Sequence, residues 1–396
     1  MEALKELEFF SALLDESENS LIKEARESGR IPIGYNCSMV PTPLLSVGKL
    51  FPVWMRAPEV TDTETGNFYL SPFNCSYSRC ILQSTIEGHC DYLGGIVFAE
   101  SCIHMDRCYD NMNVARMNDF LKDKLRFMLP MPRKDFAPHM DILKDNLHRL
   151  TQELGERFDV DMSDENIRKA IVEHNELVSL LKKISDLRLA DNPVITGTEW
   201  HTVMVACQIA PIDMLMQPLK KLWTALKKRA ADVEALPRIM VVGTDIDDPK
   251  FTELIEKQGC RVVADRYCWG ALPGLETIPV DGDVYHNLAE FYVSSSQCPR
   301  MMSQSDERMN YMEKIAKEYR TDGIIFEVMK FCDLWGWEAL KAEPKAKEIG
   351  VPYMKLEREY HLSGEGQLRT RVQAFVERIN NINLDESLAC KEENHD

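Results

Sequence analysis

Short apolar runs rich in β-branched residues alternate with helix-length amphipathic segments in the first and last thirds of the chain. Strands separated by helix-length segments are typical of parallel βαβ units. Each third is therefore predicted to form a doubly wound α/β unit. In the first third the runs are residues 31–35, 53–56 and 95–99. In the last third they are residues 238–243, 261–265, the run that ends at Cys332, and 352–357.

Helical periodicity replaces this pattern between about Pro138 and Ala235. Helix-capping residue types begin at Ser163, and apolar residues then recur at helical spacing as far as Ile184. The predicted fold class is α/β, with two Rossmann-like, mostly parallel sheets. The predicted parts are an N-terminal α/β domain over 1–137, a helical insert or linker over 138–235 and a C-terminal α/β domain over 236–396.

The charge of the chain argues against some binding partners, and its hydropathy argues against a membrane crossing. The 396 residues carry a net charge of −17, which repels nucleic acid and anionic membrane surfaces. Neither is expected as a partner. The most apolar later stretch, Val203 to Leu219, is interrupted by prolines and polar residues and is not predicted to cross a bilayer. The first residues lack the features of a signal peptide, so a cytoplasmic location is expected.

Three of the twelve cysteines, Cys75, Cys102 and Cys332, stand where a predicted β-like run gives way to a helix. The carboxyl ends of parallel strands line the crevice in which open α/β sheets bind ligands, so the three thiols could face one crevice. Most other cysteines are expected to be small buried hydrophobes. Structural zinc usually shows two closely spaced cysteine pairs. At most one such pair is present, which favours an iron–sulfur site.

A series of short motifs runs in one order along almost the whole chain: Gly34–Pro41, Asn74–Ser76, Glu100–Cys102, Cys298–Pro299, Lys330–Asp333 and Gly366–Phe375. Together they resemble the 2-hydroxyacyl-CoA dehydratase family, whose superfamily includes benzoyl-CoA reductase subunits and double-cubane cluster proteins. The resemblance implies a [4Fe-4S] cluster between two Rossmann-like domains. It also implies that Cys75, Cys102 and Cys332 are the metal ligands.

The same resemblance implies an activity and its partners. The chain would be a subunit of a hydro-lyase from an anaerobe, which removes water from a 2-hydroxyacyl-CoA to give an enoyl-CoA. The reaction would proceed through a ketyl radical after one-electron activation. A related second subunit in a heterodimer, or a second copy in a homodimer, is implied as partner. A separate ATP-hydrolysing activator with its own iron–sulfur cluster is implied as well.

Two other functions stay open from the sequence. One is an ATP-dependent reductase of the double-cubane type, acting on small molecules or an aromatic acyl-CoA. The other is a non-catalytic, cluster-bearing subunit that relays electrons. Cys37 and Cys298 lie within the family-like motifs, and if they also bind iron the group would be a double-cubane [8Fe-9S] cluster. The alternative is that Cys37 starts a helix and Cys298 lies in a turn.

Ser38 and Glu59 are the candidates for orienting or deprotonating a substrate, because both lie near the predicted mouth of the N-terminal domain. His104 is a further candidate, as a hydrogen-bond partner of a thiolate or as an ordinary loop histidine.

Overall fold

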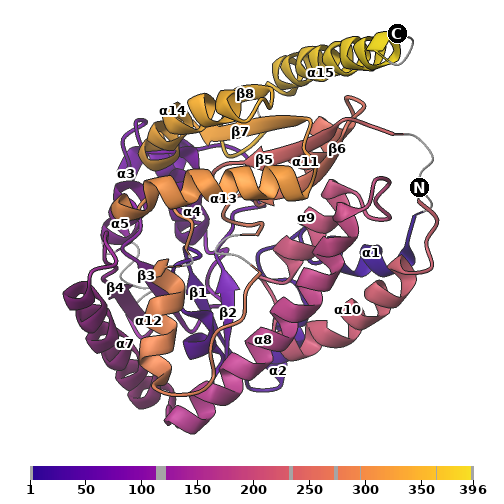
Figure 1. The fold of residues 1–396 in the computed structure, drawn as a ribbon. Coiled ribbons are helices and arrows are strands. Elements are labelled where there is room, and N and C mark those ends of the chain that lie inside the picture. The colour runs from indigo at the N-terminus through magenta and orange to yellow at the C-terminus, as the bar shows by residue number, and fades with distance from the viewer. Residues whose placement is uncertain are drawn as a thin grey trace.

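Two four-stranded, all-parallel sheets organise the chain (Figure 1). The computed structural model describes residues 3–112, 122–231, 235–271, 275–294, 296–362 and 364–393. The first sheet has the order β2-β1-β3-β4, with β1 (Ile31–Tyr35), β2 (Leu50–Trp54), β3 (Gly95–Ala99) and β4 (Leu125–Leu129). The second has the order β6-β5-β7-β8, with β5 (Arg238–Val242), β6 (Arg261–Arg266), β7 (Gly323–Met329) and β8 (Tyr353–Arg358). The predicted α/β class with two parallel sheets is confirmed.

Helices cover both sheets and fill the region between them (Figure 1). Five helices precede the strands of the first sheet in the chain or connect them: α1 (Lys5–Ser11), α2 (Ser20–Glu27), α3 (Glu64–Tyr69), α4 (Ser76–Ile86) and α5 (Ile103–Asn111). The middle helices are α7 (Ala137–Phe158), α8 (Asp164–Asp186), α9 (Gly197–Ala206) and α10 (Ile212–Leu226). The second sheet is accompanied by α11 (Lys250–Glu256), α12 (Val284–Ser294), α13 (Ser305–Glu318), α14 (Asp333–Glu348) and α15 (Glu365–Glu393). Short 3-10 turns lie at Thr42–Ser46, Leu187–Leu189 and Met302–Gln304.

The middle helices contact both halves of the chain. Helix α9 packs against α1 on one side and against α11 and β6 on the other. Helix α12, from the C-terminal part, packs against α7. The domain limits at residues 137 and 235 stay a prediction.

Two strands differ from the sequence expectation. Strand β2 begins at Leu50 rather than at Val53 and includes Pro52. Because β2 is an edge strand, a residue without an N–H is tolerated there. Strand β4 was not predicted, although Leu125–Leu129 alternates between buried and more exposed positions, as a half-covered edge strand does.

The expectation that Cys75 follows a β-like run is wrong, because helix α3 precedes it. Packing against α4 explains the helix. A Cβ atom at Gly66 would lie 2.4 Å from the backbone oxygen of Arg79, so only glycine permits this close approach. The Gly66 N–H also donates to Oε1 of Gln83 at 3.0 Å. These tertiary contacts override the local strand propensity of the aromatic residues.

A buried polar network joins the two halves. Arg56 lies two residues beyond the end of β2. Its Nε donates a hydrogen bond to Oδ2 of Asp247 at 3.2 Å. The Tyr360 hydroxyl donates to the same oxygen at 2.6 Å and accepts the Ala57 N–H at 3.0 Å. All three side chains are at most 6% exposed. Removal of any one partner would leave a buried charge or donor unsatisfied.

Tyr360→Phe is therefore expected to lower the free energy of unfolding by about 2 kcal/mol, because the Asp247 carboxylate and the Ala57 N–H both lose a partner. Urea unfolding followed by circular dichroism measures it. Tyr69→Phe, at a half-buried position in α3, is the control and should stay within about 0.5 kcal/mol of the parent. Equal effects of the two substitutions would contradict the role of the network.

Candidate active site

Cys75, Cys102 and Cys332 line one cavity of about 320 Å³, here called the thiol cavity. Each cysteine is the residue that immediately precedes a helix: α4, α5 and α14, respectively. Three helix N-termini therefore converge on the cavity, and each carries the positive end of a helix dipole. The arrangement favours an anionic group at this place.

Burial sets the acid–base properties of these thiols. It raises the pKa of Cys75 to about 11 and raises the pKa values of Cys102 and Cys332 well above the usual range. The mutual repulsion of the thiolates adds to the rise for Cys102 and Cys332. Backbone amides three residues further on, in the first turn of each helix, act in the opposite direction but are outweighed. Without a cationic partner the thiols are thus protonated at neutral pH.

Polar groups fix the walls of the thiol cavity. Nδ1 of His104 accepts the backbone N–H of Cys75 at 3.2 Å, so His104 contacts the cysteine backbone. Two arginines, Arg133 and Arg300, line the same cavity. Both bring positive charge to a region that holds several thiols.

The C-terminal sheet contributes a loop held by a buried carboxylate. Thr244 and Asp245 line the thiol cavity just beyond β5. Oε2 of Glu327 accepts both the backbone N–H and the hydroxyl of Thr244 at 2.8 Å, and its other oxygen is paired with Arg358 at 2.9 Å. Burial first, and then nearby carboxylates, raise the pKa of Asp245 to about 8.

Three more cysteines, Cys37, Cys268 and Cys298, form a second group of thiols beside the cavity. Burial is the largest cause of a raised pKa in each, and Cys298 adds to the rise for both Cys37 and Cys268. Cys332 also raises the pKa of Cys268. The second thiol group is thus within electrostatic reach of the first.

Sequence reasoning missed Cys268. The signal was present, because Cys268 comes two residues after β6, as Cys37 comes two residues after β1. Each sheet therefore places a cysteine of the second thiol group just beyond a strand end.

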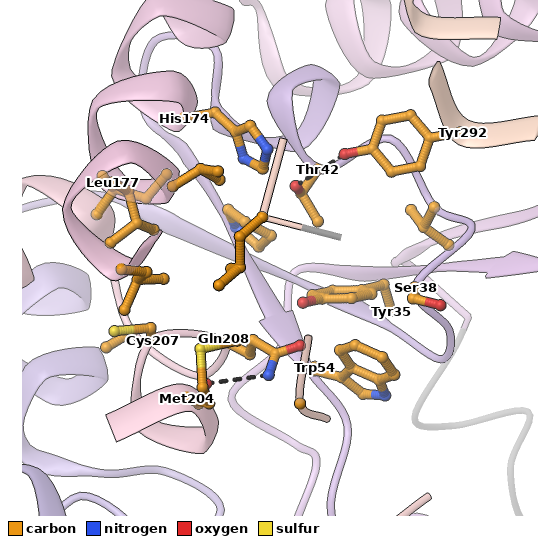
Figure 2. A pocket seen from close by; sticks show the side chains of 18 of the residues that line it. Tyr35, Ser38, Thr42, Trp54, His174, Leu177, Met204, Cys207, Gln208 and Tyr292 are labelled. Atoms are coloured by element: carbon orange, nitrogen blue, oxygen red, sulfur yellow. Dashed lines mark hydrogen bonds between the residues drawn. The ribbon is translucent and has the colours of Figure 1, made fainter. Parts of the chain in front are cut away.

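The structure does not bring Ser38 and Glu59 to the thiol cavity. Ser38 lines a different, largely apolar cavity (Figure 2). Both carboxylate oxygens of Glu59 accept hydrogen bonds from Ser17, at 2.5 Å from the backbone N–H and 2.7 Å from the hydroxyl. Glu59 thereby fixes a turn near the N-terminus. The predicted role of Ser38 and Glu59 as an acid or base stays a prediction.

Within the described ranges, no group of three or more His, Cys, Asp and Glu side chains is arranged so that it could hold a metal ion. The three cysteines of the thiol cavity line its walls and do not meet at one point.

The family model for the D-component of 2-hydroxyglutaryl-CoA dehydratase matches residues 37–379. The chain belongs to this family. The matched segment contains every cysteine of both thiol groups. The resemblance predicted from the short motifs is confirmed.

Members of the dehydratase family from bacteria are similar over most of the chain. The (R)-phenyllactyl-CoA dehydratase beta subunit of Clostridium sporogenes is 23% identical over 373 residues, which are 93% of this chain and 97% of that protein. The putative dehydratase subunit YjiM of Escherichia coli is 27% identical over 263 residues, 63% of this chain and 67% of that protein. The beta subunit of lactoyl-CoA dehydratase from Anaerotignum propionicum is 20% identical over 363 residues, 89% of this chain and 93% of that protein.

Within the residues that the structure describes, no helix combines the length and the apolar character that a membrane crossing requires.

Glu327→Ala is expected to lower the free energy of unfolding by about 3–5 kcal/mol, because the buried Arg358 guanidinium and the Thr244 donors lose their partner. Thermal or urea unfolding measures the change. Glu357→Ala, at an exposed position of β8, is the control, and its effect should be within about 0.5 kcal/mol. A loss below about 1 kcal/mol for Glu327→Ala would show that Glu327 does not support the loop.

Proposed function

We propose that the chain is a subunit of a 2-hydroxyacyl-CoA dehydratase, a hydro-lyase that converts a 2-hydroxyacyl-CoA to an enoyl-CoA. The observation that carries the proposal is the convergence of Cys75, Cys102 and Cys332 on one cavity. These thiols come from distant parts of the sequence in a chain that belongs to the dehydratase family. The named activities of its relatives, which act on phenyllactyl-CoA and lactoyl-CoA, support the same reaction class.

The thiol cavity fits a [4Fe-4S] cluster held by Cys75, Cys102 and Cys332. Thiolates are the usual ligands of such clusters, and each iron takes its own ligand, so the thiols need not meet at one point. The negative charge of three thiolates is balanced by the N-termini of α4, α5 and α14 and by Arg133 and Arg300. When bound, the cluster would supply single electrons and an open iron that acts as a Lewis acid.

The residues of the chain position and shield this site. The hydrogen bond from the backbone N–H of Cys75 to His104 fixes the turn that carries the Cys75 thiol. Glu327 holds Thr244 and thereby the loop after β5 that lines the same cavity. A substrate enclosed between these walls is shielded from water, which radical chemistry requires.

The partners follow from the same proposal. The relative from Clostridium sporogenes is named as a beta subunit, which supports a second, related subunit beside this chain. A separate ATP-hydrolysing activator with its own iron–sulfur cluster would deliver the electron.

Iron and acid-labile sulfide counting after anaerobic purification tests the cluster. About four irons per chain are expected for one cubane. Cys332→Ser should lose most of the iron and the visible absorption while circular dichroism stays unchanged, because one ligand is removed without loss of core volume. Cys260→Ser is the control, since Cys260 is buried just before β6, at the opposite edge of the sheet. Full iron content in Cys332→Ser, or zinc or no metal in the parent protein, would refute the proposal.

The second thiol group supports a second candidate, a reductase of the double-cubane type. Cys37, Cys268 and Cys298 are buried or half-buried. Cys37 lies within electrostatic reach of Cys102, and Cys268 within reach of Cys332, while Cys298 interacts with Cys37 and Cys268. Three additional thiols are what a second cubane would require at the same crevice.

Cys268→Ser separates the two candidates. With a double cubane, the parent protein is expected to contain about eight irons per chain and the variant about four. With a single cubane, both proteins should contain about four. The measurement is the same iron and sulfide count, made on samples matched for protein by amino-acid analysis.

A further inference from the structure

A second cavity lies where the first sheet, the middle helices and the C-terminal part meet (Figure 2). This apolar cavity has a volume of about 110 Å³. Tyr35 and Trp54, at the ends of β1 and β2, form an aromatic side with ring centroids 5.2 Å apart. Leu177 and Leu181 of α8 and Met204 of α9 form an aliphatic side.

None of the described residues that line the apolar cavity carries a formal charge at neutral pH, because Asp, Glu, Lys and Arg are absent from its walls. Burial lowers the pKa of its one histidine, His174, to about 4, so the imidazole is neutral. A charged ligand would lose its hydration here and find no countercharge, which costs several kcal/mol. The walls therefore select against ions.

A few polar groups face the apolar cavity. Nε2 of Gln208 donates to the backbone oxygens of Met204 and Trp269 at 3.0 and 2.9 Å, which fixes its amide group. The hydroxyls of Thr42 and Tyr292 lie 3.3 Å apart. Figure 2 shows the imidazole of His174 and the hydroxyl of Tyr35 directed toward the space between these groups. A largely apolar pocket with few, fixed polar groups is the usual form of a small-molecule site.

We propose that the apolar cavity binds a neutral, mainly apolar organic group of about the size of a benzene ring that carries one hydrogen-bonding group. The ring fits between the aromatic and aliphatic sides, and its polar group meets the Tyr35 hydroxyl. The volume is of the order of the roughly 150 Å³ apolar cavities that take up benzene. The proposal does not rest on the dehydratase function.

The position of the apolar cavity is compatible with two kinds of ligand that could supply the bound organic group. Ser38 lines the cavity, while the neighbouring Cys37 belongs to the second thiol group, so one loop separates the two regions. The bound group is therefore either a free molecule or the acyl end of a thioester that reaches past this loop.

Isothermal titration calorimetry on the full chain, purified anaerobically, tests the selectivity. The probes are 4-methylphenol, 4-methylbenzoate and 4-methylbenzylamine, which share a ring and differ in charge. One molecule of 4-methylphenol should bind per chain, and the two charged compounds should bind at least about tenfold more weakly. No binding of 4-methylphenol, or equal binding of the three, overturns the proposal.

Variants locate the binding. Val178→Phe fills the apolar cavity from α8 and should abolish binding of 4-methylphenol, whereas Val172→Phe, at an exposed position of the same helix, should leave it unchanged. Tyr35→Phe keeps the ring and removes the hydroxyl, so the dissociation constant should rise about fivefold. If Val178→Phe does not fold, the dissociation constant of Tyr35→Phe decides whether 4-methylphenol binds in the apolar cavity. Unchanged binding in the folded variants overturns the proposal.

Competition distinguishes the two sources. Displacement of 4-methylphenol by phenylacetyl-CoA identifies the acyl end of a thioester, and displacement by phenylacetamide alone identifies a free molecule. If neither displaces it, the cavity does not accept a neutral ring with one hydrogen-bonding group as a class, and the proposal is overturned. Calorimetry of 4-methylphenol uses neither an iron count nor a dehydratase assay, so failure of the dehydratase proposal and failure of this one are separate results.

Discussion

The buried ion pair between Arg56 and Asp247 joins the two halves of the molecule, and both cavities are lined by residues from both halves. Arg56 comes from the end of β2, whereas Asp247 follows β5 of the other sheet. Tyr360, just beyond β8, completes the network. Buried pairs of this kind add little net stability compared with a well-packed apolar contact, but a mismatched arrangement would leave charges unpaired. The pair therefore favours one relative placement of the sheets, and the placement determines which strand ends meet.

The thiols lie close together because the carboxyl ends of the strands of both sheets face the same cavity. In a parallel sheet every carboxyl end lies at one edge, and ligands bind where the strand order reverses. In both sheets that point is beside the first strand of the unit, β1 or β5. Cys102 follows β3 and Cys332 follows β7, the strands next to these. The topology, repeated in the two sheets, thus brings residues 230 positions apart to one cavity without any local cysteine motif.

Electrostatics distinguishes the two cavities. The thiol cavity has arginines and three helix N-termini around it, so it is suited to an anionic group with soft ligands. The apolar cavity has no formal charge on its described walls. The loop of residues 36–39 connects the apolar cavity with the second thiol group, because Ser38 lines that cavity and Cys37 belongs to that group. The two cavities thus differ in the charge that surrounds them, although the first sheet contributes residues to both.

The sequence by itself determined the α/β class, most strand positions, the family, and the start of helices at Cys102 and Cys332. These features depend on local periodicity and short motifs, which a single sequence contains. The tertiary structure decided the rest. It placed Cys75 after a helix because Gly66 packs against α4, grouped the unpredicted Cys268 with Cys37 and Cys298, and directed Ser38 and Glu59 away from the thiol cavity. Such groupings depend on contacts between residues far apart in the chain, and no local pattern specifies them.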